Sequence, residues 1–141
     1  MNYTEYTQSK FNVDISNIVA QVKASYITYD CIAGIKRGGL IPGVVLSHQL
    51  GVPFMSFDIE DQDGPRYQGE KTLWVDDILD SGKTMQHVLQ MGGDCAVLIW
   101  NVNQHIKPRY YGRIIDRKFE PKWINFWWEH PYLMEASKVW V

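Results

Sequence analysis

The chain has 141 residues and a formal net charge of −2, with 45% hydrophobic and 21% charged residues. This length and composition fit one globular domain with a sizeable core and exclude a disordered chain. The charge gives no broad attraction to nucleic acid or to acidic lipid, and no apolar run approaches the roughly 20 residues of a membrane span.

The first third of the chain begins without the basic and apolar regions of a signal peptide in residues 1–6, so we expect a cytoplasmic protein. Apolar residues at helical spacing then predict an amphipathic helix over about residues 13–25, with Asn12 or Asp14 as its cap. A short apolar run predicts a strand at residues 31–35, buried on both faces.

The middle of the chain continues this alternation. A glycine-bearing turn at residues 36–39 precedes a helix over about residues 40–50, and a strand follows at residues 53–59. Residues 60–71 are polar and contain two glycines, which predicts a loop.

The pattern then repeats with a strand at residues 73–77 and a helix over about residues 82–91, which Gly92-Gly93 ends. A further strand is predicted at residues 95–100, and residues 101–122 read as irregular. Strands that alternate with helices indicate an α/β fold with a parallel sheet and helices on both faces. Ligands bind such sheets beyond the carboxyl ends of the strands.

Cys31 and Cys95 both fall inside predicted strands. We therefore expect two buried free thiols of a reducing compartment, and no disulfide. The histidines and cysteines show no spacing typical of a zinc site.

The most informative segment is Leu73–Thr84, where an apolar strand ends in two carboxylates, Asp76 and Asp77. A third carboxylate, Asp80, comes directly before a small-residue turn that opens a helix. That turn offers backbone N–H groups to a phosphate, and its residues are Ser81, Gly82, Lys83 and Thr84. Carboxylates repel a phosphate, so their position beside it indicates another function, such as binding sugar hydroxyls, holding a divalent metal or moving a proton.

Two better-known motifs fail at single positions. A Walker A loop ending in Gly82-Lys83-Thr84 needs a glycine where Asp77 stands. An EF-hand loop built on Asp61, Asp63 and Glu70 would begin at Ile59, which has no ligand oxygen.

Residues 73–84 match the phosphoribosyl-pyrophosphate motif at every position, and the chain thereby resembles the type I phosphoribosyltransferases. The resemblance covers roughly residues 30–130 and is strongest to the bacterial xanthine–guanine branch. It implies a Rossmann-like parallel sheet with flanking helices and a small C-terminal hood. We expect one domain over residues 1–141, with a core at about 12–103 and a base-binding hood at about 104–141.

A second group of residues, Lys36, Arg37 and Gly38, lies between a strand and a helix. Glycine lets the backbone approach an anion closely, and the two cations add charge-assisted donors. The group resembles the family's pyrophosphate loop. A tight turn with a solvated basic pair is the alternative.

The C-terminal part supplies a third group, which resembles the family's base-binding hood. The resemblance implies base contacts for Lys107, Trp123, Ile124 and Glu129. Lysine would donate to a ring oxygen, and tryptophan would stack on the ring. The alternative is a hydrophobic edge strand or a subunit interface, which is the role we expect for Trp127 and Trp128.

The resemblance implies a glycosyltransferase of purine salvage and nucleotide metabolism. It would transfer ribose 5-phosphate from phosphoribosyl pyrophosphate to guanine, xanthine or hypoxanthine, with Mg²⁺ as cofactor and Asp80 as the base that takes the proton. Asp77 and Glu129 are candidate Mg²⁺ ligands. We expect a homo-oligomer, a dimer or a tetramer, that binds neither nucleic acid nor membrane.

Residues 60–71 depart from the family, which usually has a longer mobile loop there. A shorter lid would exclude water less well, and Arg66, Tyr67 and Lys71 are its candidates for reaching the pyrophosphate. Two alternative functions stay open: transfer to another base, and a regulator that keeps the fold without turnover. The intact Asp80 favours the enzyme.

Overall fold

A five-stranded parallel sheet in the order β3-β2-β4-β5-β6 forms the centre of the protein. The structure is a computed structural model that describes residues 3–60 and 71–129. The strands of this sheet are β2 (Cys31–Ile35), β3 (Phe54–Phe57), β4 (Thr72–Leu79), β5 (Asp94–Asn101) and β6 (Tyr110–Ile115). All neighbouring pairs are parallel, which confirms the predicted α/β fold.

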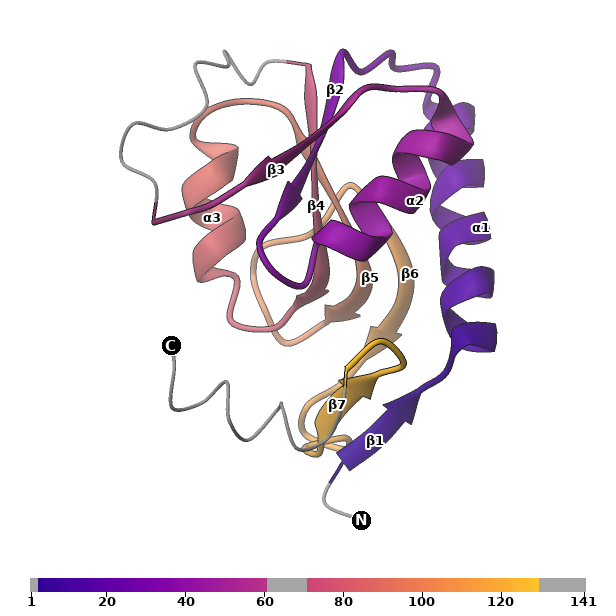
Figure 1. Cartoon of the computed structure of the whole chain (residues 1–141). Coiled ribbons are helices and arrows are strands. Elements are labelled where there is room, and N and C mark those ends of the chain that lie inside the picture. The colour runs from indigo at the N-terminus through magenta and orange to yellow at the C-terminus, as the bar shows by residue number, and fades with distance from the viewer. Residues whose placement is uncertain (1–2, 61–70, 130–141) are drawn as a thin grey trace.

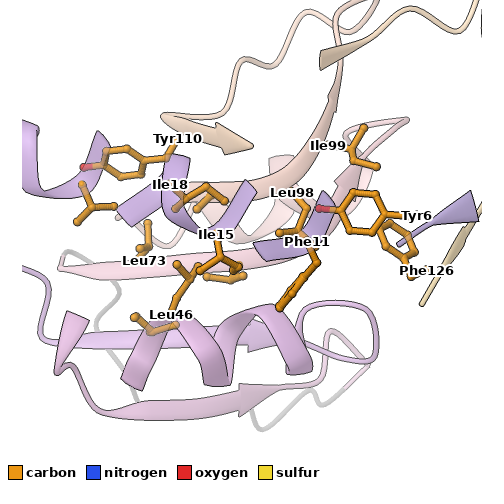
Figure 2. Packing of buried hydrophobic residues seen from close by; sticks show 14 of the residues in the cluster. Tyr6, Phe11, Ile15, Ile18, Leu46, Leu73, Leu98, Ile99, Tyr110 and Phe126 are labelled. Carbon is orange, nitrogen blue, oxygen red and sulfur yellow. The ribbon is translucent and has the colours of Figure 1, made fainter. Parts of the chain in front are cut away.

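Helices cover both faces of this sheet (Figure 1). They are α1 (Gln8–Ser25), α2 (Leu40–Leu50) and α3 (Lys83–Leu89). Figure 2 shows the larger core, where α1 and α2 pack on one face through residues such as Ile18, Leu46 and Leu73. The smaller core lies under α3 and contains Met85 and Val88. None of the helices in the described ranges has the length and apolar character of a membrane span.

A second, two-stranded parallel sheet forms a hood at the carboxyl end of the main sheet (Figure 1). It pairs β1 (Tyr3–Tyr6) with β7 (Trp123–Phe126), so that the first described strand lies beside the last. The hood is tied to the core through Asp14 of α1, which is almost fully buried. The Tyr6 hydroxyl donates to Asp14 at 2.5 Å, and Arg113 Nε of β6 donates at 2.7 Å.

The central elements agree with the sequence predictions to within two or three residues, and Cys31 and Cys95 are buried free thiols as expected. Gly92 and Gly93 follow α3 with positive φ angles of 97° and 89°, which only glycine adopts easily. The strand expected at residues 53–59 is shorter and ends at Phe57.

Three predictions are corrected by the structure. α1 begins at Gln8 with Thr7 as its cap, because the Thr7 side chain accepts from Lys10 N, so neither Asn12 nor Asp14 caps it. Residues 110–115 form β6 where irregular chain was expected. The main sheet therefore extends past residue 103, and the hood takes one of its strands from the N-terminus.

Candidate active site

The carboxyl end of β4 presents the acidic pair at the centre of the candidate site. Asp77 N donates to Asp76 Oδ1 at 2.9 Å, and Ile78 N donates to Asp77 Oδ1 at 2.7 Å, so the backbone orients both carboxylates. Successive side chains of a strand point to opposite faces. Accordingly, Asp76 lines one pocket and Asp77 lines another.

The first pocket has a volume of about 100 Å³ and surrounds the turn between β4 and α3. Gly82 ends this turn as the N-cap of α3, with φ 81°, a left-handed conformation that favours glycine. The lining residues are Asp76, Ile78, Leu79, Asp80, Ser81, Gly82, Thr84 and Met85. Backbone N–H groups at the start of a helix suit an anion of the size of a phosphate.

The turn between β2 and α2 also lies beside β4, because β2 is the neighbour of β4 on the side opposite β5. The Lys36–Arg37 peptide bond is cis, and both side chains are exposed. A Cβ built on Gly38 would overlap the Asp77 carboxylate, so this turn lies directly against the acidic pair. The predicted basic turn and the predicted acidic strand end therefore meet in space.

The second pocket, of about 170 Å³, lies between the end of β4 and the hood. We call it the hood pocket. Its lining residues are Asp77, Ile78, Asp80, Arg117, Trp123, Ile124, Phe126 and Glu129. Trp123 is 46% exposed at the pocket's edge, whereas Ile124 is buried. Ile78 and Asp80 line both pockets, so the two cavities adjoin at the end of β4.

Arg117 is a site residue that the sequence analysis missed. Its Nε donates to Asp80 Oδ1 at 3.1 Å and its Nη2 donates to Asp80 Oδ2 at 3.0 Å, a bidentate pair. Asn101 Nδ2 also donates to Asp80 Oδ1, at 3.2 Å. In the sequence nothing distinguishes Arg117 from its neighbour Lys118, because both stand in a segment without periodicity.

Lys107, predicted to touch a base, does not line the hood pocket. Its Nζ lies 5.8 Å from the centre of the Trp100 ring, and Trp100 is partly buried and packs against the smaller core under α3. The structure thus brings Trp123, Ile124 and Glu129 together with Asp77 in the hood pocket, and Lys107 is not among the lining residues. Arg66 and Tyr67 lie outside the described residues.

Burial and crowding of negative charge set the electrostatics of the site. The pKa of Asp76 is raised well above its ordinary value, first by burial and then by the charge of Asp77. Burial also raises the pKa of Asp77. Burial and the charge of Asp77 raise the pKa of Glu129, while the Arg37 cation partly offsets this rise. These carboxylates would ionise more readily beside a bound cation.

The donor set fits Mg²⁺ that is shared with a phosphate ligand. Mg²⁺ prefers hard oxygen ligands and commonly takes one or two protein carboxylates, with phosphates and water completing its shell. Asp77 and Glu129 both line the hood pocket and interact through their charges. In residues 3–60 and 71–129, no three acidic, histidine or cysteine side chains gather as a complete metal cage.

A parallel sheet with a phosphate-sized turn, an acidic strand end and a hood is the arrangement of the type I phosphoribosyltransferase fold, and the chain resembles this family. The chain is similar to purine phosphoribosyltransferase from Pyrococcus horikoshii, with a TM-score of 0.74 and 28% identity over 92% of this chain and 96% of that one. A xanthine–guanine–hypoxanthine phosphoribosyltransferase from Helicobacter pylori gives a TM-score of 0.74 at 21% identity, over 96% of this chain and 99% of that one.

The curated relatives include xanthine–guanine phosphoribosyltransferase from Vibrio vulnificus, which is 33% identical over 72 residues. That match covers 43% of this chain and 47% of the relative, so it spans about half the length of the curated protein. No protein-family model matches the chain.

Proposed function

We propose that the chain is a purine phosphoribosyltransferase. It would transfer ribose 5-phosphate from phosphoribosyl pyrophosphate to a 6-oxopurine and release pyrophosphate and a nucleoside monophosphate. The observation that carries this proposal is the pair of adjoining cavities that share Asp80. One suits a phosphate and the other a flat ring, and a bound nucleotide would span both. The named relatives, which are purine phosphoribosyltransferases, support the choice of acceptor.

The substrate would extend across the end of β4. Residues 80–84 would bind the 5-phosphate, and Lys36, Arg37 and Gly38 would bind the pyrophosphate. Asp76 and Asp77 would orient the ribose hydroxyls between these two sites. Trp123 would stack on the base, and Ile124 would approach its edge through backbone groups. Mg²⁺, held by Asp77 and Glu129 together with the pyrophosphate, would neutralise the charge of the leaving group.

The proposed transfer requires negative charge near the ribose ring and a group that accepts a proton from the base. Cleavage of the bond between C1 and pyrophosphate leaves positive charge on the ribose ring, which the carboxylates of Asp76 and Asp77 would stabilise. The attacking ring nitrogen carries a proton, and the Asp80 carboxylate would accept it. Arg117 and Asn101 fix the orientation of that carboxylate.

An assay of pyrophosphate release with each purine base tests the proposal. We expect turnover with guanine, xanthine or hypoxanthine that requires Mg²⁺ and phosphoribosyl pyrophosphate. Calorimetry should show tight binding of phosphoribosyl pyrophosphate with Mg²⁺ and weak binding without it. Binding without turnover of any base would instead identify a regulator. Sedimentation of the same sample would test the expected dimer or tetramer.

A further inference from the structure

A third pocket lies at the amino end of the main sheet, away from the candidate active site. The last turns of α1 and α2 and the connection that leads into β2 form it. Figure 1 shows these segments at the end of the sheet opposite the hood. We call it the amino-end pocket, and its volume of about 340 Å³ is about twice that of the hood pocket. Its apolar lining residues are Val22, Ile27, Ile32, Leu50 and Val52.

The rim of this pocket carries an exposed tyrosine in an unfavourable backbone conformation. Tyr26 caps α1 with φ 58°, and within residues 3–60 and 71–129 it is the one residue other than glycine with a positive φ. Glycine or asparagine usually occupies such a cap, because a Cβ is unfavourable there. Tyr26 is also 94% exposed, so packing within the described chain does not offset this strain. A strained residue that presents an aromatic ring to solvent indicates a binding role.

One charge of each sign lies beside the same pocket. Lys23 lines the pocket, and Asp30 directly follows the lining residues Thr28 and Tyr29; both charged side chains are exposed. Neither forms an ion pair with any residue in the described ranges. A surface that combines a projecting ring, an apolar cavity and both signs of charge can be complementary to itself, as a two-fold interface requires.

We propose that the amino-end pocket is an interface between two copies of this chain. Tyr26 of each copy enters the pocket of the other, and its ring packs against the apolar lining. Lys23 of each copy then faces Asp30 of the other. The candidate active site lies at the opposite end of the sheet, so this pairing leaves its pockets open to substrate. The contact places the expected homo-oligomer interface and does not depend on the proposed reaction.

Sedimentation equilibrium with Tyr26→Gly tests this interface. Glycine removes the ring and suits the left-handed cap, so the variant should fold at least as well as the wild type. The wild type should be a dimer, or a tetramer if a second interface exists, and the variant should have half that mass at the same concentration. We expect the dissociation constant to rise about a hundredfold or more, because each interface loses two aromatic anchors.

The matched control is Phe119→Ala, which removes an aromatic side chain that is 81% exposed in the segment between β6 and β7. It should leave the mass unchanged. Thr28→Trp fills the pocket from an exposed lining position and should halve the mass as Tyr26→Gly does. Lys23→Glu and Asp30→Lys should each weaken assembly about tenfold, and the double variant should restore it, because the charges are then exchanged across the interface.

A wild type that stays monomeric at every concentration would overturn the proposal and leave the pocket to another occupant. An oligomer whose mass is unchanged in both Tyr26→Gly and Thr28→Trp would overturn it too, because the copies then meet elsewhere. Dissociation of Phe119→Ala to the same extent would show that the effect is not specific to Tyr26. If Tyr26→Gly does not fold by circular dichroism, Tyr26→Asn takes its place, since asparagine also tolerates the left-handed cap.

Discussion

Gly38 and Asp77 lie so close together that any side chain at position 38 would occupy the space of the Asp77 carboxylate. Two segments that are distant in the sequence, the turn after β2 and the end of β4, are thus fitted to each other without a gap. The fit requires glycine for its lack of a Cβ, because φ at this residue is not in the left-handed region.

Gly38→Ala should therefore displace the Asp77 carboxylate from the site. We expect kcat/KM to fall by about a hundredfold, since displacement of a reacting group by about 1 Å has effects of this size. Gly51→Ala is the control, because its Cβ would meet nothing within 4 Å although φ is 67°. The control should lose about 1 kcal/mol of stability and keep its activity. Equal activity in both variants would contradict the role given to this contact.

Asp80→Asn should lower kcat by about a hundred- to ten-thousandfold, the range expected for loss of a proton acceptor. The amide keeps the shape of the side chain but does not accept the proton. Nucleotide binding should change much less than kcat, because both pockets keep their other lining residues. Steady-state kinetics and calorimetry on the same preparation provide the comparison, and wild-type turnover would remove Asp80 from the mechanism.

Arg37→Ala should weaken binding of pyrophosphate and of phosphoribosyl pyrophosphate by about ten- to a hundredfold, the value of a charge-assisted hydrogen bond. A nucleoside monophosphate places no phosphate at the turn after β2, so its affinity should stay within about twofold. This ligand serves as an internal control for folding. If all three affinities fall together, the turn has a structural role only.

Asp76→Asn should stabilise the unliganded protein at neutral pH. The pKa of Asp76 is raised in the folded chain, so its contribution to stability is complete below the unfolded pKa of about 3.9 and is lost as the pH rises through the raised pKa. Asparagine has no charge to desolvate. We expect a gain of about 1 kcal/mol or more at pH 8 that shrinks toward pH 4, because each tenfold change in proton affinity is worth about 1.4 kcal/mol.

Urea unfolding at several pH values would measure this gain. Asp30→Asn, at an exposed position, is the control and should show little change at any pH. A stabilisation by Asp76→Asn that grows as the pH falls would contradict the expected direction, since protonation removes the buried charge at low pH.

Arg113→Met should destabilise the protein by about 3 kcal/mol, because it leaves the buried Asp14 carboxylate without its cation. Arg109→Met is the matched control. Its ion pair with Asp94 spans 3.8 Å and is more exposed, so its loss should cost less than about 1 kcal/mol. Thermal or urea unfolding distinguishes the two, and a loss in Arg113→Met as small as that expected for Arg109→Met would show that the Asp14 network contributes little to stability.

The elements that follow a simple apolar pattern could be predicted from the sequence. Elements whose residues are chosen for contacts with segments distant in the sequence could not. β2, β4 and β5 are nearly continuous apolar runs, so their burial on both faces was readable. β6 contains Gly112 and Arg113, which interrupt the pattern. A Cβ on Gly112 would overlap Asp14, and Arg113 pairs with Asp14. The residue types at both positions are therefore explained by their contacts with α1 and not by the pattern of the strand.

The candidate site likewise contains residues that the sequence motif predicts and a residue that only the fold brings to them. Asp76, Asp77 and Asp80 stand in one short motif whose spacing is fixed by a strand and a turn. Arg117 joins them only through the fold, since its bonds reach Asp80 in the turn after β4 and two carbonyls of its own segment. Single-sequence spacing carries no record of such a contact, whereas the base contact predicted for Lys107 of the Lys-Pro pair stays a prediction.

The pairing of β1 with β7 has a consequence for how the protein is made. Tyr3 is synthesised well before its partner Trp123, and at about 5–20 residues per second that delay is of the order of ten seconds. The phosphate turn at residues 80–84 can form earlier, once β2, β4 and α3 have been synthesised. The hood pocket cannot form at that stage, because the hood that lines it pairs β1 with β7, from the two ends of the described chain. A nascent or truncated chain would therefore hold phosphate before it can select a base.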